Sequence, residues 1–130
     1  MDIDEDRSGL LRLVLKLDAV ASGALGALSL AAGPALDDLL GTPLALLVPV
    51  GAFLVLWAAA LWGLASRARI SRTAVLAVIG LNLLYAVDAI TVAMTGWFPL
   101  SDLGIAFVLA QAAAVALFAA AQLYALRRAP

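Results

Sequence analysis

Residues Thr73 to Thr95 read TAVLAVIGLNLLYAVDAITVAMT, a predominantly apolar stretch with one carboxylate, Asp88, and one amide, Asn82, near its middle. About 20 apolar residues in an α-helix, each rising about 1.5 Å, cross the hydrocarbon layer of a bilayer. An ionised carboxylate is costly at that depth. The stretch therefore predicts a membrane-spanning helix in which Asp88 faces other protein or a water-filled cavity.

The composition places the rest of the chain in the same class. Of its 130 residues, 65% are hydrophobic and 13% are charged, whereas soluble domains use about 45 to 50% apolar residues even with glycine included. The length predicts one domain, residues 1–130. Cysteine and histidine are absent, which excludes disulfides and removes the usual zinc and haem ligands and the commonest general base. We therefore predict no catalytic residues, no cofactor and no metal site, and the sequence does not favour an enzyme.

Three further apolar stretches accompany the first, which predicts spans over about 11–32, 44–65, 73–95 and 102–126. Their connections are short, so the predicted fold class is an all-α membrane protein, a four-transmembrane-helix bundle with antiparallel up-down neighbours. The segment GPALDDLLGTP (33–43) has the composition of a turn. The acidic leader MDIDEDRSG (1–9) has no apolar periodicity, and we predict a solvated tail.

The basic residues predict the orientation. With four crossings, all eight fall on one side of the membrane: Arg7, Arg12, Lys16, Arg67, Arg69, Arg72, Arg127 and Arg128. Only acids, Asp37, Asp38 and Asp102, lie in or beside the loops on the other side. By the positive-inside rule, both termini should be cytoplasmic in a multi-pass protein of the cell (inner) membrane. The bilayer is the predicted partner, with anionic lipids held by Arg67, Arg69, Arg72, Arg127 and Arg128, and nucleic acid is not expected.

Depth along the spans groups several polar residues. If the cytoplasmic boundary lies near residues 14, 66, 73 and 126, Asp88 is about 22 Å deep at 1.5 Å per residue, and Gln111 and Ser29 fall at its level. A glutamine amide can donate to an ionised carboxylate or accept from a protonated one. The candidate intramembrane site is therefore Asp88, Gln111, Asn82, Tyr85 and Ser29. The alternative is that Asp88 and Gln111 only fix helix register, through bonds worth about 0.6 kcal/mol on average.

A second acid lies in the first span. Asp18 is two residues from Lys16, near the cytoplasmic boundary, where it could form an ion pair with Lys16 or with a cation of a neighbouring helix. Its depth differs from that of Asp88 by about 16 Å, compared with about 5 to 9.5 Å between the paired carboxylates of glycosidases. The sequence therefore does not support a catalytic pair of carboxylates.

The size and span count are similar to those of the small multidrug resistance transporters. That resemblance implies an essential glutamate in the first span and little charge bias, whereas this first span has Asp18 near its edge and the bias is complete. The segments LKLDAV (15–20), GPALDDLLG (33–41) and GAFLVLWAAALWG (51–63) resemble uncharacterised four-helix integral membrane proteins of actinobacteria. This second resemblance covers most of the chain and implies a four-helix bundle, but no activity and no site residue.

Two functions are therefore open. The chain is a small transporter or solute-binding bundle that uses an intramembrane aspartate, with a homodimer as its expected form. Alternatively, it is a non-catalytic accessory or structural subunit of a larger membrane complex, in which Asp88 has a purely structural role.

Overall fold

The computed structural model describes residues 2–3, 9–41 and 43–128. Within these ranges the chain forms five helices and two very short strands: β1 (Asp2–Ile3), α1 (Gly9–Ala31), α2 (Gly33–Leu40), α3 (Leu44–Ala65), β2 (Ile70–Ser71), α4 (Arg72–Thr95) and α5 (Asp102–Arg127). By length and composition, α1, α3, α4 and α5 can each cross a membrane. The chain is thus a multi-pass membrane protein, and its four long helices begin and end within two residues of the predicted spans.

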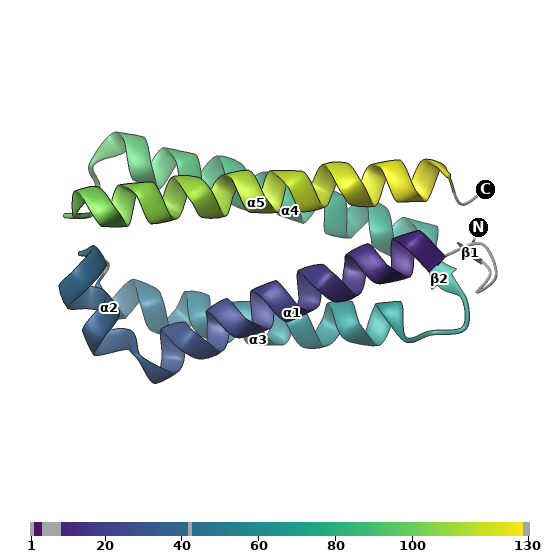
Figure 1. Cartoon of the computed structure of the whole chain (residues 1–130), viewed down its shortest axis with the longest axis horizontal. Coiled ribbons are helices and arrows are strands. Elements are labelled where there is room, and N and C mark those ends of the chain that lie inside the picture. Colours follow the sequence, from purple (N-terminus) through teal and green to yellow (C-terminus); the bar gives the residue numbers. More distant parts are fainter. Residues whose placement is uncertain (1, 4–8, 42, 129–130) are drawn as a thin grey trace.

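The long helices pack in pairs (Figure 1). Helix α1 lies along α3 and helix α4 lies along α5, while α1 also touches α5. We refer to α1, α2 and α3 as the first hairpin and to α4 and α5 as the second hairpin. The strands and the C-terminal end of α5 lie at one end of the molecule, and α2 lies at the other (Figure 1). We call these the basic end and the acidic end, because the described cations lie at the first and Asp37, Asp38 and Asp102 at the second.

The most deeply buried apolar side chains gather at the basic end. Leu11, Leu15, Leu61, Val75 and Leu126 are each at most 1% exposed and belong to one packed cluster. We call these five residues the inner plug. Because they come from all four long helices, the plug joins the two hairpins where the chain carries its arginines.

Two segments differ from their predictions. The segment GPALDDLLGTP was predicted to be a turn, but residues Gly33–Leu40 form helix α2. Pro34 stands in its first turn, where a missing N–H costs no hydrogen bond, and Gly41 ends the helix in the left-handed region at φ 73°. The leader was predicted to be a solvated tail, but its residues 2–3 pair antiparallel with Ile70–Ser71; residues 1 and 4–8 lie outside the described part.

Helix α2 connects the hairpins at the acidic end. The backbone N–H of Ser101 donates to the Leu40 carbonyl at 2.9 Å, and the Ser101 hydroxyl donates to the Leu39 carbonyl at 2.9 Å. The same hydroxyl caps α5 by accepting from the Gly104 N–H at 3.0 Å. Gly104 lets the two backbones approach, since a Cβ there would lie 2.1 Å from the Leu40 oxygen. The loop between α4 and α5 is therefore hydrogen-bonded to the C-terminal end of α2, which links the second hairpin to the first.

The crossing of α1 and α3 supplies a test of the packing. A Cβ on Gly26 would lie 2.7 Å from the Gly51 carbonyl oxygen and 3.0 Å from the Leu54 Cβ. We expect Gly26→Ala to lower the free energy of unfolding by about 1–3 kcal/mol, because overpacking displaces the helices. Unfolding in mixed micelles measures this. The matched control is Gly80→Ala, where a Cβ meets nothing within 4 Å; an equal loss in both variants would contradict the close crossing.

Candidate functional site

Three buried polar side chains meet between the two hairpins. Asp18 of α1 is 2% exposed, Asn82 of α4 is 5% exposed and Gln122 of α5 is fully buried. The Asp18 Oδ2 accepts from the Gln122 Nε2 at 2.7 Å and from the Asn82 Nδ2 at 3.0 Å. The Asn82 Nδ2 also donates to the Gln122 Oε1 at 3.0 Å, so the three groups form a closed triangle. We call Asp18, Asn82 and Gln122 the polar triad.

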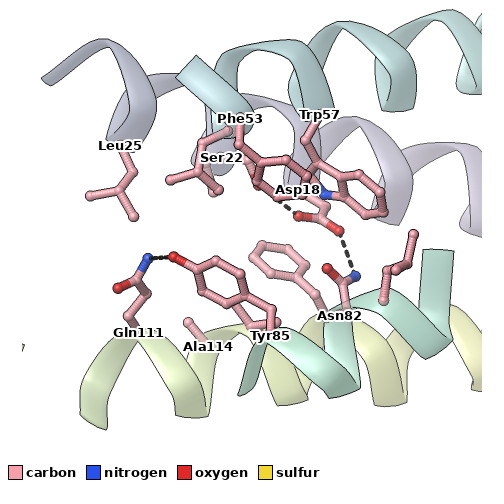
Figure 2. Close-up of a pocket in the computed structure, with 14 residues that line it drawn as sticks. Asp18, Ser22, Leu25, Phe53, Trp57, Asn82, Tyr85, Gln111 and Ala114 are labelled. Atoms are coloured by element: carbon pink, nitrogen blue, oxygen red, sulfur yellow. Dashed lines mark hydrogen bonds between the residues drawn. The ribbon is translucent and has the colours of Figure 1, made fainter. Parts of the chain in front are cut away.

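A fourth group completes the environment of the carboxylate. The Ser22 hydroxyl, one turn along α1, donates to the Asp18 Oδ1 at 3.1 Å (Figure 2). Both carboxylate oxygens are therefore hydrogen-bonded, and the triad links α1 of one hairpin to α4 and α5 of the other. Each of these donors is an uncharged amide or hydroxyl, which stabilises an ionised carboxylate without neutralising it.

Lys16 and Asp18, for which the sequence suggests an ion pair, have other partners among the described contacts. The Lys16 Nζ lies 5.1 Å from the centre of the Trp62 ring, a cation–π contact at the basic end. Arg12, one turn earlier, donates to the carbonyls of Ala65 and Arg67 at the end of α3. Both cations therefore contact α3 or the residues that follow it at the basic end. Asp18 is buried in the bundle and receives its hydrogen bonds there.

A small cavity adjoins the triad. We call it the inner cavity; it encloses about 90 Å³, and Asp18, Ser22 and Asn82 line it together with Tyr85 and Gln111. Figure 2 shows these side chains converging from α1, α4 and α5, with the aromatic rings of Phe53 and Trp57 beside them. The two rings stack with centroids 5.9 Å apart. The buried carboxylate therefore borders a space large enough for about one to three water molecules.

A larger cavity lies toward the acidic end. We call it the outer cavity; it encloses about 610 Å³ between the hairpins and is lined by residues of all five helices. It shares lining residues with the inner cavity, so the two are neighbours along one path. The shared residues are Leu25, Phe53, Leu54, Leu81, Tyr85 and Gln111. At this junction the Gln111 Nε2 donates to the Tyr85 hydroxyl at 2.6 Å (Figure 2).

The structure distributes the predicted site residues over these two cavities. Asp88, Gln111, Tyr85 and Ser29 all line the outer cavity. They do not form the predicted layer of bonds, however, because Gln111 pairs with Tyr85 and the Ser29 hydroxyl donates to the Leu25 carbonyl of its own helix at 2.9 Å. Asp88 is exposed on the cavity side. Asn82 lies deeper, in the polar triad.

Sequence reasoning missed Asp18 and Gln122 as buried partners. The cations of α1 had placed the cytoplasmic boundary near residue 14, which left Asp18 shallow. Counted from the start of each helix instead, Asp18 is nine residues into α1 and Asn82 ten residues into α4, depths of about 14 and 15 Å at 1.5 Å per residue. That shared depth was the available signal.

Comparison with known proteins identifies no family. No protein-family model, no curated protein and no solved structure compared with this chain matches it. The resemblances suggested by the sequence are therefore supported only as far as four long apolar helices. Function has to be argued from the triad and the two cavities.

Proposed function

We propose that this protein is a small transporter that moves protons across the membrane, with Asp18 as the group that carries the proton. The observation behind the proposal is a carboxylate that is 2% exposed, hydrogen-bonded to uncharged groups and placed beside a cavity. Ionisable residues inside membrane spans are costly, and they mark substrate and ion pathways or proton relays in many membrane proteins. Asp18 fits that description better than Asp88, which is exposed.

The polar triad suits both protonation states of Asp18. The ionised carboxylate accepts from Ser22, Asn82 and Gln122. A protonated carboxyl group would instead donate to an amide oxygen, and the Asn82 and Gln122 side chains each supply one. Among the described residues, the hydrogen-bonding partners of Asp18 are all uncharged. Proton uptake and release at this position therefore need only small rearrangements of two amides.

Asp18 has cavities on its acidic-end side and tightly packed side chains on its basic-end side, an asymmetry that a proton carrier requires. Toward the acidic end, the inner cavity leads to the outer cavity past Tyr85 and Gln111. Toward the basic end, the inner plug closes the bundle with side chains at most 1% exposed. The arrangement supports a state in which Asp18 exchanges protons with one side only.

Movement of one hairpin against the other would open the opposite side. Each hairpin packs closely within itself, whereas α1 and α5 make most of the contact between the long helices of different hairpins. Many transporters alternate by rigid-body rocking of two such units around a fixed site. Asp18 is suited to that role because it bonds across the boundary, to Asn82 and Gln122.

Orientation and partners form part of the proposal. We expect the basic end to face the cytoplasm, with both termini inside, because positively charged loops are retained there. Arg67, Arg69, Arg72, Arg127 and Arg128 would then meet the anionic headgroups of the inner leaflet. A homodimer or a larger complex stays a prediction, and cross-linking in native membranes tests it.

Proton flux into proteoliposomes tests the function. Vesicles loaded with a pH-sensitive dye, and held at an inside-negative potential by potassium and valinomycin, should acidify faster with the protein than without it. We expect Asp18→Asn to lower the protein-dependent rate at least tenfold, since an amide cannot carry the proton. Asp38→Asn is the control, because this acid is exposed on α2 and lines neither cavity.

Two results would oppose the proposal. Acidification no faster than in protein-free vesicles, with correctly folded protein, favours the accessory-subunit alternative. Equal rates for the parent and Asp18→Asn mean that protons pass elsewhere. Circular dichroism and a single symmetric size-exclusion peak establish that each variant is folded before its flux is compared.

A further inference from the structure

We infer that the outer cavity binds a monovalent organic cation with a large apolar body, and that Asp88 is its counter-charge. This site is separate from the proton site, and the inference rests on the lining of the outer cavity, not on Asp18. Its volume of about 610 Å³ falls within the range of about 300–1,000 Å³ typical of sites for drug-sized ligands. The space is therefore far larger than a proton pathway needs.

The lining is apolar apart from four residues, Ser29, Tyr85, Asp88 and Gln111. Three of these already use polar atoms within the protein: Ser29 bonds to its own helix, and Gln111 bonds to Tyr85. Asp88 takes part in none of the hydrogen bonds or ion pairs found among the described residues. A ligand entering the outer cavity thus meets one uncommitted charged group on an otherwise apolar surface.

The charge of the ligand follows from the same surface. Among the described residues, Asp88 is the one charged residue in the lining, and Asp37, Asp38 and Asp102 lie at the acidic end, toward which the cavity extends. All the described cations lie toward the basic end. An anion would be repelled by these acids on approach and would meet no positively charged side chain in the lining. A cation would be attracted both on approach and within the cavity. The rings of Phe53, Tyr85 and Phe107, which also line the cavity, favour a cation further.

The lining also favours a large apolar cation over a metal ion or a small hydrated ion. A hard metal cation needs six or more oxygen ligands, and no three acidic side chains come together anywhere in the described ranges. A small hydrated ion would lose its water against leucine and valine side chains without replacement. An organic cation with a delocalised or shielded charge loses little hydration and gains apolar contact with residues such as Leu36, Leu84 and Val92.

Binding of tetraphenylphosphonium to the full-length protein in lipid nanodiscs tests the inference, with empty nanodiscs subtracted. Tetraphenylborate, an anion of the same shape, is the matched ligand. We expect the cation to bind at least tenfold more tightly than the anion. Asp88→Asn should weaken cation binding about tenfold or more, whereas Asp102→Asn, at an exposed position outside the lining, should leave it within about twofold.

A steric variant covers the case in which Asp88→Asn fails to fold. Leu84 lines the outer cavity and is 56% exposed, so Leu84→Trp should narrow the cavity without disturbing the buried core. It should also lower the affinity about tenfold. Equal affinity for the two ligands, or full cation affinity in both variants, would overturn the inference.

The outcome separates this inference from the proposed function. Asp18→Asn should lose proton flux and keep tetraphenylphosphonium binding, because Asp18 does not line the outer cavity. If the parent binds the cation and passes no protons, the proton carrier is wrong and the cation site stands. If protons pass but no cation binds, the reverse holds.

Discussion

Gln122→Leu is expected to lower the free energy of unfolding by about 1–3 kcal/mol, the cost of leaving buried polar groups without partners. Gln122 is fully buried, donates to Asp18 at 2.7 Å and accepts from Asn82 at 3.0 Å. Hydrogen bonds in membrane proteins contribute only about 0.6 kcal/mol on average. We expect the larger value because the lost donor serves a carboxylate, and hydrogen bonds to charged groups contribute more than those between neutral groups.

Removing the whole triad should restore most of that stability. In the variant Asp18→Leu with Asn82→Leu and Gln122→Leu, no buried charge or amide is left unpaired, and apolar replacements of buried ionic groups are often neutral or stabilising. Equilibrium unfolding of the parent, the single variant and the triple variant measures the coupling. Gln111→Leu is the control, since Gln111 is only partly buried and its bond to Tyr85 lies outside the triad.

The triple variant also separates a structural role from a transport role. If the triad only fixes helix register, a folded triple variant should behave like the parent in every assay. If Asp18 carries the proton, the triple variant should be folded and stable but pass no protons. A triple variant that is as unstable as Gln122→Leu would show that the loss in the single variant comes from altered packing and not from the unpaired carboxylate.

The spans were readable from the sequence because membrane crossing depends on length and apolarity alone. Helices α3, α4 and α5 are long and apolar, and their ends lie close to charges and prolines. Pro49, inside α3, does not end that helix. The segment that forms α2 was harder to predict from the sequence. Its Gly and Pro residues are typical of turns, yet Pro34 at a helix start and Gly41 at a helix end are also compatible with a short helix. The contacts of α2 with α3 and α5 are not readable from the local sequence.

The polar triad could not be found by counting from a boundary. Asp18 follows two cations in α1, Arg12 and Lys16, whose positions predict a membrane surface close to Asp18. Their side chains reach the end of α3 and the Trp62 ring, so their backbone positions lie deeper than their charges. Asp88 looked isolated in an apolar stretch, but sequence alone does not show which face of α4 meets α1.

We expect the outer cavity to contain water beside Asp88. The chain has no native cysteine, so single cysteines can be placed in an otherwise unreactive protein. In right-side-out membrane vesicles, we expect Asp88→Cys to react with a charged, membrane-impermeant methanethiosulfonate reagent, because such reagents need a hydrated thiolate. Asp38→Cys, on the acidic end, should react as well. Arg128→Cys, on the basic end, should react only after the vesicles are made permeable.

Val87→Cys provides the matched control at nearly the same depth. Val87 is 59% exposed and lies beside Asp88 in α4, but it lines neither cavity, so we expect it to face lipid and to stay unreactive. The extent of labelling should differ almost completely between these adjacent positions, because a thiol in hydrocarbon neither ionises nor meets the reagent. If both cysteines stay unlabelled, the outer cavity is filled by lipid or by a partner helix. The route to Asp18 would then have no aqueous entrance. Labelling of Arg128→Cys in sealed vesicles would reverse the orientation, and with it the direction of proton entry.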